Sequence, residues 1–154
     1  MNNTETKEKI FTVITGAEAE VIEPKPTEWI IETLFPMGFK TILAGTTGAN
    51  KSIYAMQEGM SIANDEDSFL GFDIKKKGLS VLFVDTEVGE DELIRRYKRI
   101  KNNFQEWDNG IDRFTMLSKK GSFAYIWDEL KQHIEKYRPD ILKLVVNKNL
   151  YNID

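Results

Sequence analysis

The amino-acid sequence predicts an α/β protein with a mostly parallel sheet and flanking helices. Strand-type and helix-type patterns alternate from residue 40 to residue 146, and the segment LSVLFVDTE, residues 79–87, is a near-continuous apolar run. Alternating strands and helices are typical of parallel sheets, because parallel strands need crossover helices. A continuous apolar run is typical of a strand that is buried on both faces of a sheet.

The expected elements follow one another in a regular order. Residues 29–35 and 40–45 are short apolar runs around a Pro-Met-Gly turn signal, and we expect a strand over residues 42–44. Acidic residues at the start and basic residues near the end of segment 89–107 match the dipole of a helix. The full pattern predicts helices over residues 51–65, 89–107 and 122–137, and strands over residues 79–87, 113–118 and 141–146.

The length of 154 residues is enough for one domain with its own hydrophobic core. Residues 1–26 form a polar lead-in that ends in the segment EPKPTE with its two prolines, and we expect this lead-in to be loosely ordered. Residues 27–154 then form the single folded domain.

Composition excludes several classes of function. The chain has no cysteine and one histidine, which argues against a disulfide framework and a zinc centre, so any metal chemistry would use Mg²⁺ and oxygen ligands. The net charge of −4 argues against an overall electrostatic attraction to nucleic acid. Neither a signal peptide nor an apolar run of membrane-spanning length is present, and we expect a cytoplasmic protein with no membrane partner.

The segment AGTTGANKS, residues 44–52, is similar to the phosphate-loop pattern G-x-x-x-x-G-K-[ST]. Such a loop follows a strand and opens a helix, so that backbone N–H groups and the helix N-terminus converge on phosphates. Lys51 would neutralise the β- and γ-phosphates, and the Ser52 hydroxyl would be a ligand of Mg²⁺. The predicted nucleotide-binding residues are Gly45, Thr46, Thr47, Gly48, Ala49, Asn50, Lys51 and Ser52.

Asn50 occupies the position of the second glycine in this pattern. Glycine is favoured in such loops because it accepts positive φ and lets the backbone approach a ligand closely. Asparagine is among the residues that best tolerate the left-handed region, so the change is mild if position 50 needs positive φ. Its side chain could instead crowd the phosphates or hydrogen-bond to them, and the sequence leaves both alternatives open.

Two carboxylates, Asp85 and Glu87, follow the strand-type run over residues 79–87. The carboxyl ends of parallel strands form the edge where open α/β sheets bind ligands. A carboxylate at this edge can orient or deprotonate the water that attacks a γ-phosphate, and we assign Lys51 and Glu87 as catalytic residues. The alternative is that the acid caps the helix that starts near Glu90, a role for which Asp85 or Thr86 is suited.

The segments WIIETLFPMGFKTILAGTTGANKS, FLGFDIKKKGLSVLFVDTE and RRYKRI together resemble the RecA-like P-loop ATPases. The similarity is greatest to AAA-type domains related to the RepA hexameric replicative helicases, and it runs over about residues 29–142. It implies a RecA-like P-loop NTPase core that binds ATP and Mg²⁺ through residues 45–52, with Glu87 as the catalytic glutamate. It also implies a ring of identical subunits, with Arg95 or Arg96 near the nucleotide or a neighbouring subunit, and a DNA partner reached through a larger assembly.

The chain departs from the pattern of this family near its C-terminus. Val145 stands where the family has an aspartate that holds the magnesium shell, and Asn147 follows two residues later. Lys143 interrupts what should be a buried strand. The sequence also ends before the later strands of the family, so we expect a core that is truncated at the C-terminus and an ATPase whose hydrolysis is weakened.

Three classes of function follow from these observations. The first is an ATP-binding domain of a DNA replication or mobile-element protein, with hydrolysis weakened. The second is a non-catalytic nucleotide-sensing or assembly module, in which the bound nucleotide orders a subunit contact. The third is a small phosphotransferase, which would need an arginine-rich lid and an acceptor pocket, and the sequence provides no segment of either type.

Overall fold

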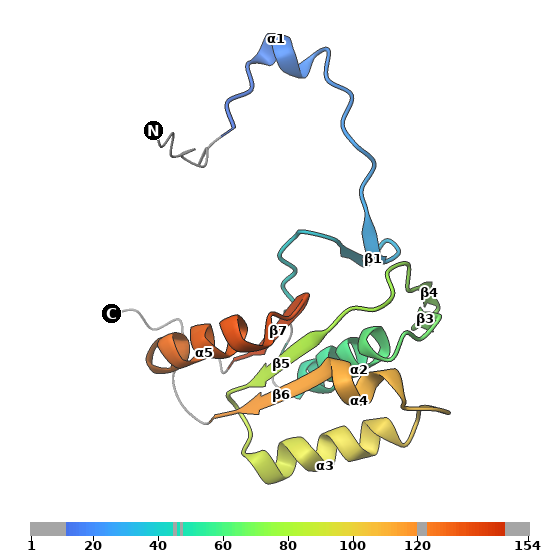
Figure 1. Ribbon diagram of the computed structural model, residues 1–154, viewed down its shortest axis with the longest axis vertical. Coiled ribbons are helices and arrows are strands. Elements are labelled where there is room, and N and C mark those ends of the chain that lie inside the picture. Colours follow the sequence, from blue (N-terminus) through green and yellow to red (C-terminus); the bar gives the residue numbers. More distant parts are fainter. Residues whose placement is uncertain (1–11, 45, 47, 120–122, 147–154) are drawn as a thin grey trace, which may run out of the picture.

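Three parallel strands form the centre of the protein (Figure 1). The computed structural model describes residues 12–44, 46, 48–119 and 123–146. In the register of the sheet, Asp85 lies opposite Ser118 on one side and opposite Val145 on the other. The three strands therefore end at the same edge. In spatial order they are β6 (Phe114–Ser118), β5 (Val81–Asp85) and β7 (Ile141–Val145).

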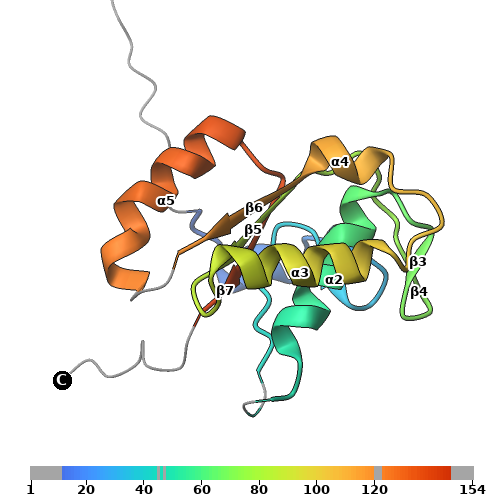
Figure 2. The same ribbon diagram turned by 90° about the horizontal axis from the view of Figure 1, so that it is seen from below.

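Helices cover both faces of this sheet (Figure 2). Val81 and Phe83 of β5 belong to the core that contains residues of α2 (Lys51–Ala63) and α3 (Glu90–Lys101). Leu82 and Val84 belong to a second core with α5 (Phe123–Tyr137). Successive side chains of a strand point to opposite faces, so the central strand is buried on both sides. The predicted α/β class, with a mostly parallel sheet and flanking helices, is confirmed.

Two short hairpins lie beside the end of α2. The strands β1 (Trp29–Ile31) and β2 (Phe35–Pro36) are antiparallel, as are β3 (Ser68–Phe69) and β4 (Phe72–Asp73). An isolated bridge between Ile31 and Ile74 joins the two hairpins. The apolar run 29–35 therefore folds back on itself, and the turn contains Thr33 with a φ of 59°.

The strand expected over residues 42–44 is wrong, because this segment belongs to no strand in the structure. The side chain of Ile42 is 89% exposed and that of Leu43 is 47% exposed. An apolar run becomes a strand only when its N–H and C=O groups pair with a neighbouring strand. Strand β7 pairs with β5 on one side, and within the described part of the chain no strand lies along its other edge.

The helix expected over residues 89–107 ends at Lys101 and is followed by an unexpected helix, α4 (Asn109–Arg113). Buried Trp107 explains the early end, because its ring must lie in the core and the chain that carries it leaves the helix direction. This ring packs against those of Tyr97, Phe104 and Phe114.

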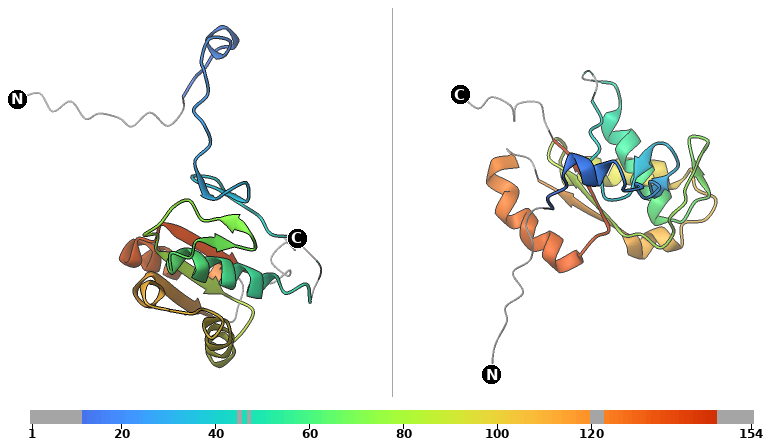
Figure 3. Two further views of the ribbon diagram at one scale, coloured as in Figure 1. Left: turned by 90° about the vertical axis from the view of Figure 1, so that its right-hand side faces the viewer. Right: turned by 90° about the horizontal axis from the view of Figure 1, so that it is seen from above.

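In the lead-in, Thr15 caps a short helix, α1 (Gly16–Ala19), through a capping box with Glu18. The segment 12–27 extends away from the rest of the protein (Figures 1 and 3). No helix within the described ranges is long and apolar enough to cross a membrane.

Lys143 of β7 and Glu58 of α2 form an ion pair between the sheet and the helix. Their side chains are 11% and 10% exposed, and the Lys143 ammonium also lies 4.9 Å from the centroid of the Phe35 ring. Burial lowers the pKa of Lys143, while the Glu58 carboxylate acts in the opposite direction. This partner explains why a lysine is accepted in a strand whose inward face is otherwise apolar.

We predict that Glu58→Gln destabilises the protein by about 3 kcal/mol, because it leaves the Lys143 ammonium buried without a counter-charge. The double change Glu58→Gln with Lys143→Met should recover most of this loss. Urea denaturation of the three proteins measures the effect. Glu129→Gln is the control, since it breaks an ion pair with Lys119 whose side chains are both about half exposed, and stability should hardly change. Equal effects of Glu58→Gln and Glu129→Gln would contradict the prediction.

Candidate functional site

The turn that follows β5 is held by a buried carboxylate. Asp85 is 0% exposed, and its Oδ1 accepts hydrogen bonds from the backbone N–H groups of Glu87 at 2.7 Å and Val88 at 3.0 Å. Neither Asp85 nor Thr86 is the cap of the following helix, since the hydrogen bonds of Asp85 go to residues that precede its first turn. Asp85 bonds the turn that leads into α3, and Gly89 is the N-cap residue of that helix.

Both neighbouring strands also hold this turn. Thr86 donates to the carbonyl of Val145 at the end of β7, from its backbone N–H at 3.0 Å and its hydroxyl at 3.2 Å. On the other side, the Ser118 hydroxyl at the end of β6 donates to the Val88 carbonyl at 2.9 Å. The turn is thus fixed to the carboxyl edge of all three strands.

Glu87 lies on this turn with its side chain exposed, two residues beyond the end of β5. The two acids of the segment VDTE therefore have different environments, since one is buried and the other faces solvent. An exposed carboxylate on a fixed turn at the carboxyl edge of a parallel sheet can contact a ligand that binds there. The buried Asp85 cannot.

Arg95 and Arg96 of α3 also differ in how far their side chains are exposed. Both bind Glu92, with Nε–Oε distances of 3.0 Å for Arg95 and 3.1 Å for Arg96. These two guanidinium groups, Arg95 first, lower the pKa of the Glu92 carboxyl. Arg96 is 23% exposed and also lies beside the β5 turn, where its Nη1 is 3.9 Å from Asp85 Oδ2. Arg95 is 65% exposed and is the more accessible of the two for a ligand or another subunit.

The predicted phosphate loop precedes α2, and its residues Gly45 and Thr47 lie outside the described residues. The carbonyl of Thr46 accepts a hydrogen bond from Lys51 Nζ at 2.8 Å and one from the Ala49 backbone N–H at 3.3 Å. The lysine side chain therefore reaches back across the loop that precedes it. Gly48 has a φ of 83°, and apart from its two neighbours in the chain no atom of the described residues lies within 4 Å of the position that a Cβ would take there.

Asn50 is the N-cap residue of α2 and has a φ of 54°, so position 50 does need the left-handed conformation. Its side chain makes no capping hydrogen bond to the first turn. The first-turn N–H groups of a helix have no partner within the helix and are suited to binding an anion. Ser52 lies in this first turn, beside Lys51. These features fit a polyphosphate.

The two halves of the predicted site come from different places in the fold. The loop before α2 and the first turn of this helix project from the body of the protein, whereas Glu87 lies on the turn between β5 and α3 (Figure 2). The described loop residues Thr46, Gly48, Ala49 and Asn50 are all exposed. Because residues 42–44 form no strand, the sheet does not hold the loop at the edge that carries Glu87.

Few described side chains near the candidate site could be ligands of Mg²⁺. Val145, at the end of β7, has no carboxylate to offer, and Asn147 lies outside the described residues. Within the described ranges, no group of three or more acidic or histidine side chains could hold a metal ion. Mg²⁺ commonly binds through phosphate oxygens and water with one or two protein ligands, so the Ser52 hydroxyl beside a bound triphosphate fits this ion.

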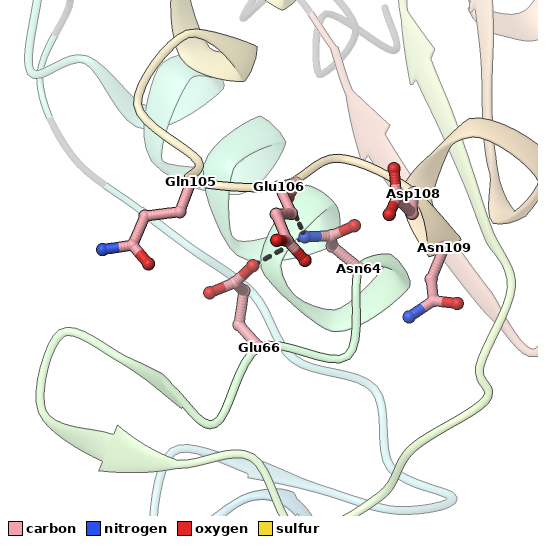
Figure 4. A pocket seen from close by; sticks show the side chains of 6 residues that line it. All are labelled: Asn64, Glu66, Gln105, Glu106, Asp108 and Asn109. Carbon is pink, nitrogen blue, oxygen red and sulfur yellow. Dashed lines mark hydrogen bonds between the residues drawn. The ribbon is translucent and has the colours of Figure 1, made fainter.

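A polar pocket of about 250 Å³ lies at the opposite end of α2 (Figure 4). The Asn64 amide donates to Glu66 Oε1 at 2.6 Å and to the Glu106 carbonyl at 2.8 Å, and it accepts from the Gly110 N–H at 3.1 Å. The pocket is roughly 20 Å from Lys51, given the rise of a 13-residue helix. Its acidic lining does not suit a triphosphate. The lining residues are Asn64, Glu66, Gln105, Glu106, Asp108 and Asn109.

Comparison with protein families agrees with this geometry. A family model described as an AAA domain matches residues 4–146, nearly the whole chain. The chain belongs to this AAA domain family. Membership indicates an ATPase-type, nucleotide-binding domain. Searches of the curated proteins and of the solved structures gave no match.

We predict that Asn50→Gly leaves stability within about 0.5 kcal/mol of the wild type, whereas Asn50→Ala costs about 1 kcal/mol, because alanine is strained at positive φ. Urea denaturation compares the two variants. Asn102, the C-cap residue of α3 with a φ of −64°, is the matched control. At that position alanine should be the better tolerated of the two. The same order of stability at both positions would contradict the prediction.

Proposed function

We propose that residues 45–52 bind ATP with Mg²⁺ and that the chain is a RecA-like P-loop member of its AAA domain family. The observation that carries this proposal is the start of α2. Left-handed Asn50 leads into an N-terminus without a side-chain cap, and Lys51 reaches back over the loop to Thr46. A triphosphate could replace the Thr46 carbonyl as the partner of Lys51. Its oxygens would then accept hydrogen bonds from the lysine ammonium and from the first-turn N–H groups.

Glu87 is the residue that would orient or activate the attacking water. Its exposed side chain stands at the sheet edge, on a turn that hydrogen bonds fix. Hydrolysis is weakened in this proposal for two reasons. Val145 provides no carboxylate for the magnesium shell, and the loop must come against the sheet edge before a γ-phosphate can meet Glu87.

A non-catalytic nucleotide-sensing or assembly module is the second candidate, and Val145 is the observation that favours it. Binding needs only the loop and the helix N-terminus, whereas turnover also needs a positioned metal and water. Binding of ATP without release of phosphate would select this second function.

The wider role that we propose is a cytoplasmic DNA replication or mobile-element protein, similar to the RepA-like helicases, that acts as a ring of subunits. DNA would then be contacted through the assembly, since the chain itself has a net charge of −4. The lysine run 75–77 does not offer an unopposed basic surface. Lys75 lies 2.8 Å from Asp73 and 3.1 Å from Glu32, and Lys76 lies 2.8 Å from Glu28.

We predict that Lys51→Ala weakens binding of MgATP by at least about a hundredfold, because it removes charge-assisted hydrogen bonds to the phosphates. Isothermal titration calorimetry measures the affinity. Lys40→Ala is the control, because Lys40 precedes the loop in an exposed segment, and its affinity should remain that of the wild type. Unchanged affinity in Lys51→Ala would exclude the phosphate-loop assignment.

We predict that Glu87→Gln binds MgATP as the wild type does and releases no phosphate above background. The amide keeps the size of the side chain and loses the base. Phosphate release is measured on the same samples as the calorimetry, with Glu90→Gln, an exposed acid in the first turn of α3, as the control. Loss of ATP binding in Glu87→Gln would give this residue a structural role instead.

A further inference from the structure

We propose that Asp85 is a positioning residue for Glu87, and that its buried carboxylate sets the turn on which the reacting carboxylate is presented. This inference rests on the proposed role of Glu87. Asp85 cannot itself touch a ligand at the sheet edge, because it is 0% exposed. Its contribution acts through the backbone of Glu87.

The hydrogen bonds of Asp85 reach the two backbone groups that decide where Glu87 lies. Oδ1 accepts from the N–H of Glu87 at 2.7 Å and from the N–H of Val88 at 3.0 Å. The Glu87 Cα therefore lies between two N–H groups that are bonded to one oxygen atom. A hydrogen bond from an N–H group to a charged acceptor is stronger than one to a neutral acceptor.

The second oxygen of Asp85 faces the helix that follows the turn. Oδ2 is buried and has no hydrogen-bond partner among the residues that the structure describes. The nearby cation is Arg96, whose Nη1 lies 3.9 Å away while its Nε binds Glu92. A buried carboxylate is costly unless it is paired, so the guanidinium of α3 and the two N–H groups together stabilise its charge. Asp85 thus connects the sheet, the turn and α3.

Positioning at this level matters for the proposed chemistry. A water molecule that attacks a γ-phosphate must be held in line, and a displacement of about 1 Å can lower the rate by about a hundredfold. The Glu87 side chain is exposed. The hydrogen bonds of its backbone therefore restrict where the carboxylate can go. Thr86 and Ser118 hold the turn to the neighbouring strands, and Asp85 bonds the N–H groups on both sides of the Glu87 Cα.

The decisive experiment compares Asp85→Ala with a matched control, Asp140→Ala. Asp140 lies just before β7, at the opposite edge of the sheet, and its Oδ2 also accepts two hydrogen bonds, from the Ser80 N–H and hydroxyl at 2.8 Å each. Amide hydrogen exchange by NMR, MgATP affinity by calorimetry and phosphate release are measured for each protein. In Asp85→Ala, exchange at Glu87 and Val88 should be at least about tenfold faster, with ATP affinity within about twofold of the wild type.

Turnover gives the second readout. Phosphate release by Asp85→Ala should fall to that of Glu87→Gln, because Glu87 acts only from the turn that Asp85 sets. Asp140→Ala should change neither exchange at residues 87 and 88 nor turnover. Exchange and turnover in Asp85→Ala equal to those of Asp140→Ala would overturn the proposal.

Asp85→Asn tests the same point in a protein with a less disturbed core. Its amide oxygen can still accept the two N–H groups, so exchange protection and turnover should recover in large part relative to Asp85→Ala. No recovery would contradict positioning through these hydrogen bonds.

If the wild type binds MgATP but releases no phosphate, the catalytic part of the proposed function fails by itself. The exchange rates at Glu87 and Val88 then decide whether Asp85 sets the turn.

Discussion

Burial of β5 on both faces is the constraint on which the rest of this structure depends. All five of its residues are buried, with Val81 and Phe83 in one core and Leu82 and Val84 in the other. A strand in this position can be stable only between two neighbours and two layers of helix. Strands β6 and β7, together with α2 and α5, meet these requirements.

Because β5 is buried, charged groups beside it need partners of opposite charge or hydrogen-bond donors. Asp85 ends the strand inside the protein and is acceptable there because N–H groups and a guanidinium surround it. Lys143, on the neighbouring strand, is acceptable because Glu58 of α2 lies beside it. Each charge is neutralised by a residue far away in the sequence or by backbone groups. Both interactions connect the sheet to the helices that carry the candidate site.

The described residues of the proposed phosphate loop, Thr46, Gly48, Ala49 and Asn50, are all exposed. The side chains of Ile42 and Leu43 are exposed, and the loop that follows projects from the body of the protein. Helix α2 is nevertheless well anchored at its other end, where Met56, Met60 and Ile62 are fully buried. The proposed site therefore combines a turn that hydrogen bonds fix, which carries Glu87, with exposed residues that lead into α2. This contrast gives a physical reason for binding to be retained more easily than turnover.

The sequence by itself determined the local elements that have a strong periodic pattern. The apolar run around Phe83 predicted the central strand, and the helix that opens at Lys51 and the strand over residues 114–118 follow from similar patterns. The left-handed tolerance of Asn50 is a property of the residue type, and the observed φ of 54° makes use of it. Such features depend on neighbours in the chain.

Only the tertiary structure decided which apolar segments find partners and what each charged residue contacts. Residues 42–44 have a strand-type pattern, but no strand of the described part of the chain pairs with them, since strand pairing depends on a segment distant in the sequence. Trp107 ended α3 early because its aromatic partners lie on three different segments. Asp85 and Glu87 look alike in the sequence, and only packing shows that one is buried and the other is presented. Burial and long-range pairing are set by the whole fold, which is the physical reason that the sequence could not assign these roles.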